Sequence, residues 1–134
     1  MNGVARYFMI LGVVSVIIGM IWGIQMSATQ DHAMSPAHAH LNLLGWVTFS
    51  IFAFYYHAVP QAAASRIAQI HLAVAALGLG TIVPGIVMAL SGQGEALAKL
   101  GSVLSLASMV IFAVVVLRPK RSSANQRAAQ TATG

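Results

Sequence analysis

Hydrophobic residues occur along this chain in four long runs, which are separated by short polar segments. Each run has about the 20 residues that an α-helix needs to cross the hydrocarbon core of a bilayer. The runs predict helices over about 7–26, 36–57, 67–90 and 97–117. Because the intervening segments are short, consecutive helices are expected to lie antiparallel. The pattern therefore predicts an all-α, integral membrane four-helix bundle that forms a single domain over residues 1–117.

Composition and charge agree with a membrane protein. Hydrophobic residues make up 58% of the 134 residues and charged residues only 7%, a balance that is unusual for soluble domains. The net charge of +5 would suggest nucleic-acid binding in a soluble protein, but here the basic residues flank the apolar runs. We therefore expect no nucleic-acid partner, and we expect the lipid bilayer to be the chain's surroundings.

The distribution of lysine and arginine predicts the orientation, because cytoplasmic loops carry the excess of these residues. With both termini in the cytoplasm, only Lys99 falls on the outer side, and the others fall inside: Arg6, Arg66, Arg118, Lys120, Arg121 and Arg127. The expected location is the bacterial inner (cytoplasmic) membrane, with several passes. Residues 118–134 are polar and poor in apolar residues, which predicts a disordered basic cytoplasmic tail.

The stretch SPAHAHLNLLGW places two histidines at the start of the second predicted helix. Ser35 is a suitable N-cap, and Pro36 is tolerated at the first helical position. Since each residue of a helix turns by about 100°, His38 and His40 point to nearly opposite faces and cannot chelate one metal ion in the way that an i, i+4 pair would. His38 lies above a face of polar and small residues, whereas His40 lies above an apolar face: Leu43, Leu44, Val47, Ile51 and Phe54.

An imidazole above an apolar face needs either contact with water near the headgroups or a bound partner, and both explanations stay open. Ionisable residues inside membrane spans are functional by default. A heme would offer iron to the imidazole and a flat apolar surface to the neighbouring side chains. The chain has no cysteine, so copper or zinc, the alternatives to heme, would need histidine, methionine or oxygen ligands.

The other three histidines are weaker candidates for binding a cofactor or a metal ion. His32 lies in a predicted loop, where Asp31 and Met34 could join it in a copper or zinc site. His71 lies a turn or more inside the third predicted helix, so it is a candidate ligand or proton-handling group. His57 follows Tyr55 and Tyr56 at a helix end, where all three are expected to act as interfacial anchors.

The segment HLNLLGWVTFSIFAFYYHAVP, residues 40–60, resembles the second helix of heme-copper oxidase subunit I, especially that of the nitric oxide reductase large subunit. The resemblance implies that His40 is an axial ligand of a low-spin heme b near the outer face. The residues that match the family's scaffold are Asn42, Leu43, Leu44, Tyr55, Tyr56 and Pro60, whereas the tryptophan is shifted by one residue. Together with the adjacent His38, the candidate cofactor-binding residues are His40, His38, Asn42, Leu44 and Trp46. The large enzymes have many more helices and additional histidines, so one copy of this chain does not form a complete reductase.

His40 and His71 are expected to differ by about 15 to 20 Å in membrane depth, whereas two axial nitrogens on one iron are only about 4 Å apart. The second axial ligand would therefore be His38, His32, Met34 or a histidine of another copy. The oxidase subunit repeats a four-helix unit with approximate threefold symmetry, which favours a homotrimer here, with a dimer as the alternative.

Two stripes of small residues allow close helix contact, either between copies or within one chain: Gly12, Gly19 and Gly23, and Gly101, Ser105 and Ser108.

The sequence thus favours a heme-binding or copper-binding membrane protein related to heme-copper oxidase subunit I, which transfers electrons or handles heme. The alternative is a cofactor-free assembly or structural partner of a respiratory complex. A small transporter is disfavoured because no predicted helix contains an embedded carboxylate. Motifs of hydrolases and dinucleotide-binding enzymes are also absent from the sequence, so no catalytic residue is predicted.

Overall fold

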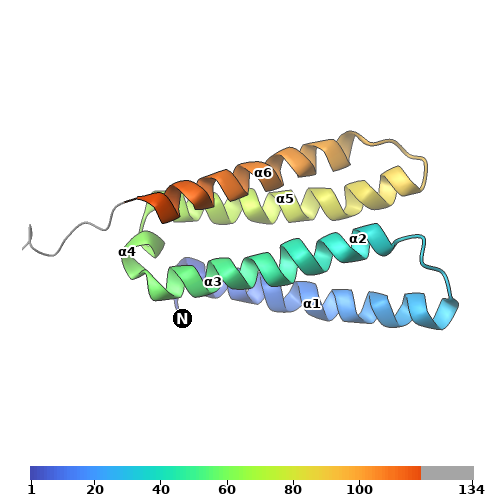
Figure 1. The fold of residues 1–134 in the computed structure, drawn as a ribbon, viewed down its shortest axis with the longest axis horizontal. Coiled ribbons are helices and arrows are strands. Elements are labelled where there is room, and N and C mark those ends of the chain that lie inside the picture. Colours follow the sequence, from blue (N-terminus) through green and yellow to red (C-terminus); the bar gives the residue numbers. More distant parts are fainter. Residues whose placement is uncertain (119–134) are drawn as a thin grey trace, which may run out of the picture.

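The computed structural model describes residues 1–118, and this part of the chain is helical, with no strand. The elements follow in the order α1 (Gly3–Thr29), α2 (Ser35–His40), η1 (Leu41–Thr48), α3 (Phe49–Ala58), α4 (Pro60–Ala63), α5 (Arg66–Leu90) and α6 (Ala96–Leu117) (Figure 1). The all-α prediction is confirmed for these residues. The predicted tail lies outside the described residues, apart from Arg118.

The helices form two antiparallel hairpins (Figure 1). One consists of α1 and the rod made by α2, η1 and α3, and the other consists of α5 and α6. Two ends can be distinguished. The terminal end holds the start of α1, the short α4 and the end of α6, whereas the loop end holds the loops 30–34 and 91–95.

Among the described residues, α1, α5 and α6 are long and apolar enough to cross a membrane, which indicates a membrane protein. The rod between α1 and α4 is divided into elements of 6, 8 and 10 residues, so none of them alone has that length. These three elements nevertheless follow one another without a break from Ser35 to Ala58.

The division arises because η1 is a π-helix, which the sequence analysis does not predict. A π-helix pairs residues five apart, and the Thr48 hydroxyl likewise donates to the Leu43 carbonyl at 2.8 Å. The two faces of the rod are still those expected from the sequence. Leu43, Val47 and Ile51 are exposed, whereas Gly45 and Phe49 are buried.

The helix ends differ in detail from the predicted ones. Gln30 adopts a left-handed conformation with φ 57°, which ends α1. Met34, and not Ser35, occupies the N-cap position of α2, and the Ser35 hydroxyl instead donates to the His32 carbonyl at 2.7 Å. Pro36 is therefore the second helical residue, one position later than predicted, and still lies in the first turn, where proline is tolerated. The predicted connector between the second and third helices contains the additional helix α4.

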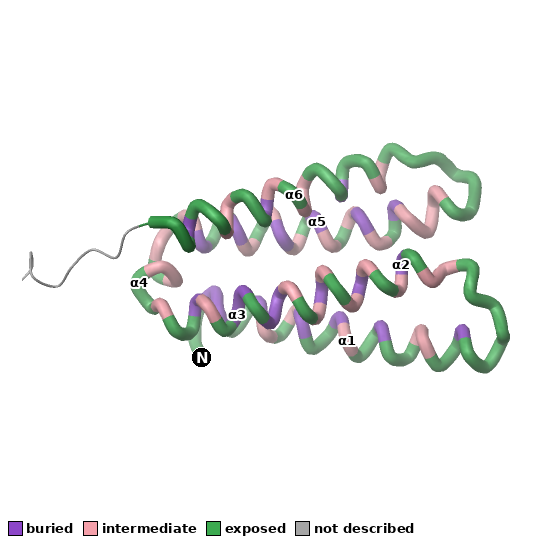
Figure 2. The backbone as a smooth tube through the Cα atoms, viewed as in Figure 1, coloured by how far each residue is buried: buried purple, intermediate pink, exposed green. Residues whose placement is uncertain are grey.

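Both stripes of small residues are used inside the chain. A Cβ atom added to Gly12 would lie 3.5 Å from the Gly45 carbonyl oxygen of η1. At Gly101 of α6, an added Cβ would overlap the backbone of Ile82 in α5. Buried positions accordingly line the inward sides of the helices, while their outward sides are exposed (Figure 2). Close packing within each hairpin therefore accounts for these glycines.

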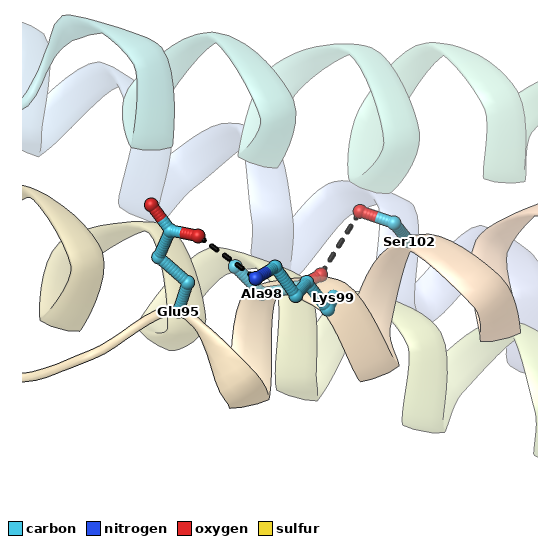
Figure 3. A network of polar contacts seen from close by, with 4 residues as sticks. All are labelled: Glu95, Ala98, Lys99 and Ser102. Carbon is cyan, nitrogen blue, oxygen red and sulfur yellow. Dashed lines mark hydrogen bonds and ion pairs between the residues drawn. The ribbon is translucent and has the colours of Figure 1, made fainter.

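The start of α6 carries a small network of polar contacts (Figure 3). Lys99 Nζ lies 3.0 Å from Glu95 Oε2, and both side chains are largely exposed. The Ser102 hydroxyl donates to the Ala98 carbonyl at 2.9 Å. These contacts are local to one helix, so they do not join the two hairpins.

Candidate functional site

The histidines inside helices occupy two separate neighbourhoods. His38 and His40 lie on α2 at the loop end, whereas His71 lies in the second turn of α5, near the terminal end (Figure 1). The fold therefore keeps these imidazoles near opposite ends of the molecule. This placement agrees with the expectation that His40 and His71 do not share one iron.

His38 faces α1. Its ring packs edge-on against Trp22, with ring centroids 6.3 Å apart, and a Cβ atom added to Gly23 would lie 3.2 Å from its Cε1 atom. The Asn42 amide donates to the His38 carbonyl at 2.9 Å and lies 3.4 Å from ring atom Nε2. The His38 ring is thus held in the interface between α1 and α2.

His40 is half-buried, and its surroundings differ from those of His38. Its Nδ1 atom donates to the Pro36 carbonyl at 2.8 Å, one turn earlier in the same helix. This hydrogen bond fixes the ring and places the proton on Nδ1, which leaves the lone pair on Nε2. Within residues 1–118, Nε2 makes no hydrogen bond. A metal-ligating histidine characteristically has this arrangement.

The other residues expected beside a cofactor are divided between two surfaces. Asn42 and Trp46 pack against α1, where they face Gly19 and Gly12. Leu44 instead lines a shallow groove at the seam between the hairpins, together with Leu79 of α5 and Met109 of α6. His40 lies one turn above Leu44. The structure therefore does not gather all five candidates around one space.

His71 is completely buried, and both of its ring nitrogens are paired. Nδ1 lies 2.9 Å from the Tyr56 hydroxyl of α3, and Nε2 lies 3.1 Å from the Ser108 hydroxyl of α6. The rings of Phe8, Phe52 and Phe112 surround it, with centroids 4.5 to 5.7 Å from that of His71. Since each hydroxyl can donate or accept, this network is satisfied whichever nitrogen carries the proton.

The Ser108–His71 contact has the spacing of a nucleophile and a general base, but its surroundings do not suit that chemistry. His71 is enclosed, and Ser108 is buried in the middle of α6. Backbone N–H groups in a helix interior are engaged in the helix's own hydrogen bonds, so they cannot stabilise an oxyanion. The arrangement therefore acts as a link between α3, α5 and α6. A metal at His71 would have to displace one of its two partners.

Tyr56 corrects one expectation, because this residue is buried at 1% exposure and does not act as an interfacial anchor. Its partnership with His71 and Ser108 was not foreseen, since nothing in the local sequence indicates which residues of three separate helices meet. His57, by contrast, is exposed at the terminal end.

His32 is exposed in the loop after α1, and its carbonyl accepts the Ser35 hydroxyl. Across residues 1–118, no three or more side chains of the types histidine, cysteine, aspartate and glutamate come together as a metal site. Methionine sulfur atoms are not among these ligand types.

The chain matches no protein-family model, no curated protein and no solved structure. The arrangement of the chain's own residues is therefore the basis for a proposed function.

Proposed function

We propose that this chain is a heme-binding protein of the bacterial inner membrane in which His40 is an axial ligand of heme b. In this proposal the rod Ser35–Ala58 is a fourth span beside α1, α5 and α6, and both termini lie in the cytoplasm. The basic residues Arg6, Arg66 and Arg118 belong to the terminal end, which supports that orientation. Lys99 lies at the loop end, where Glu95 offsets its charge.

The observation that carries the proposal is the state of the His40 ring. Its Nδ1 proton is committed to the Pro36 carbonyl, and its Nε2 atom has no hydrogen-bond partner within the described residues. A second hydrogen bond of this kind orients histidine ligands and increases their basicity in metalloproteins. His38 and His71 lack this combination, because one packs against α1 and the other has both nitrogens engaged.

The residues around His40 suit a flat apolar group. Leu44 lies one turn below it at the seam between the hairpins, and Leu43 and Val47 present exposed apolar side chains on the adjoining face. When bound, heme b would supply an iron that accepts and releases one electron. The leucine and valine side chains would keep water from the edge of the porphyrin. Copper or zinc bound at the same Nε2 atom is the alternative.

The second axial ligand is proposed to come from another copy of the chain. Of the alternatives within the chain, His38 packs against Trp22 of α1, His32 is exposed in the loop before α2, and Met34 lines a pocket at the end of α1. We therefore favour a ligand from another copy over these three. Because the small-residue stripes are used within each hairpin, copies would meet through exposed apolar side chains such as Leu43 and Val47. A closed homotrimer is the proposed assembly because the oxidase subunit that the rod resembles repeats a four-helix unit three times, and a dimer is the smaller alternative.

An absorption spectrum tests the proposal. Protein purified in detergent from heme-sufficient cells is expected to show a Soret band in proportion to its amount. The His40→Ala variant should lose that band, and the His57→Ala variant, which changes an exposed histidine of the same rod, should keep it. Circular dichroism shows whether each variant is folded, and light scattering gives the number of chains.

A colourless, folded and metal-free wild-type protein would overturn the proposal. Copurification of that protein with oxidase subunits would instead support a cofactor-free partner of a respiratory complex. A Soret band that survives in His40→Ala but is lost in His38→Ala would transfer the ligand role to His38.

A further inference from the structure

A pocket distinct from the groove beside Leu44 lies at the loop end, at the C-terminal end of α1. Trp22, Gln25, Met26 and Thr29 contribute from the last turns of α1. Asp31 and Met34 contribute from the following loop. The left-handed conformation of Gln30 ends the helix between these two groups. The turn therefore brings the loop back over the end of α1 and creates the pocket.

The size of this pocket limits what it can enclose. Its volume is about 130 Å³. Pockets for organic ligands typically measure about 300 to 1,000 Å³, whereas one water needs only about 10 to 15 Å³. The space is too small for a porphyrin or another cofactor of that size. It has room for a single ion with its ligands.

The donor atoms select the kind of ion. Met26 and Met34 offer two thioether sulfur atoms, and Asp31 offers the pocket's one carboxylate. One oxygen of that carboxylate already accepts the Ala33 N–H at 3.0 Å, and the Thr29 hydroxyl donates to the Gln25 carbonyl at 3.0 Å. Calcium requires six to eight oxygen ligands, which this lining does not provide. Thioether ligands favour soft Cu(I).

The charge and the aromatic ring agree with a monovalent cation. Asp31 is exposed and would balance a single positive charge. Tryptophan attracts a cation within about 6 Å of its ring more strongly than tyrosine or phenylalanine does, and Trp22 lines this pocket. Its own position is fixed by the edge-on contact with His38.

We propose that Met26 and Met34 bind Cu(I) in this pocket, with Trp22 against the ion and Asp31 as the balancing charge. Methionine also fills gaps in apolar interiors, and Met26 is buried, so the test must separate binding from packing. The site is independent of the proposed heme ligand. It shares no residue with the coordination of His40.

Titration of the full-length protein in detergent tests the site. Ag(I) in chloride-free buffer serves as a redox-inert probe, and Cu(I) is added under anaerobic conditions with ascorbate. Saturable quenching of tryptophan fluorescence is expected, and Trp22→Phe should abolish it while Trp46 remains. Met26→Leu and Met34→Leu are each expected to weaken binding at least tenfold. Met20→Leu is the matched control, because Met20 is an exposed methionine on the same helix outside the pocket.

Equal affinities of the Met34→Leu, Met26→Leu and Met20→Leu proteins would overturn the proposal. So would the absence of saturable quenching in the wild type, or binding of Zn(II) with the same dependence on both methionines. Met34 is only half-buried, so Met34→Leu keeps the test decisive if Met26→Leu fails to fold. The two proposals remain distinguishable. His40→Ala should retain Cu(I) binding, and Met34→Leu should retain the Soret band.

Discussion

His71 and His40 show two ways in which this chain accommodates an imidazole in an apolar environment. His71 is fully buried, with Tyr56 and Ser108 bound to its two nitrogens and aromatic rings around it. His40 is half-buried, with one nitrogen on a backbone carbonyl and the other without a partner in the described part of the chain. Burial alone would select His71, whose ring nitrogens are both paired, whereas the proposed heme ligand is the less buried His40.

The difference suggests a criterion for a ligand: a ring nitrogen without a hydrogen-bond partner in the protein is a better indication of a binding role than burial of the ring. A buried polar group costs free energy unless it is hydrogen-bonded. At the terminal end, the hydroxyls of Tyr56 and Ser108 provide these hydrogen bonds to His71. At the loop end the Nε2 lone pair of His40 is left for water, a metal or a heme. We therefore expect substitutions near His71 to affect stability and substitutions of His40 to affect cofactor content.

The largest effect is expected from His71→Ala. It should lower the free energy of unfolding by about 3 kcal/mol, mostly through lost ring packing, since an interhelical hydrogen bond in a membrane contributes only about 0.6 kcal/mol. Reversible unfolding in mixed detergent and sodium dodecyl sulfate measures the change. His57→Ala, at an exposed position of α3, should remain within about 0.5 kcal/mol of wild type. Equal effects of the two variants would contradict a structural role for His71.

Gly19→Ala tests the interface at the loop end, with an intermediate effect. An added methyl group would overlap the Asn42 amide, so that side chain must move and lose its bond to the His38 carbonyl. The expected loss, relative to a glycine-to-alanine change without a clash, is about 1 kcal/mol in the same unfolding assay. In Gly80→Ala, the matched control, the added Cβ meets nothing within 4 Å. Alanine should there be neutral or stabilising by up to about 1 kcal/mol. Equal effects of Gly19→Ala and Gly80→Ala would show that the Asn42 contact contributes nothing measurable.

The pattern of apolar runs was sufficient to predict the long helices, because a helix needs about 20 consecutive apolar residues to cross a bilayer. Within the rod, the small and polar residues below His38 indicated the face that packs between helices. Leu43, Val47 and Ile51 are exposed as the pattern implies. It did not predict the π-helix η1. A run of apolar residues does not indicate whether the backbone hydrogen bonds join residues four apart, as in an α-helix, or five apart, as in a π-helix.

The site was less predictable than the fold. The position of His40 followed from local spacing, and its Pro36 partner lies only one turn away. The network of Tyr56, His71 and Ser108 joins residues 15 and 37 positions apart, which only the packing of three helices brings together. The pocket between Met26 and Met34 depends on the left-handed Gln30, and no glycine marked that turn in the sequence.

The smallest effect is expected at the exposed ion pair of Glu95 and Lys99. Both side chains are largely accessible to water, which screens the attraction, so Glu95→Gln should cost less than about 0.5 kcal/mol. The difference from wild type should shrink further as salt is raised from low to physiological ionic strength. Ser102→Ala, which changes the neighbouring hydroxyl that bonds only within α6, is the matched control. A loss above about 1 kcal/mol that persists at high salt would contradict water exposure at this end. It would mean that another copy or the lipid headgroups cover the start of α6 in the assembled protein.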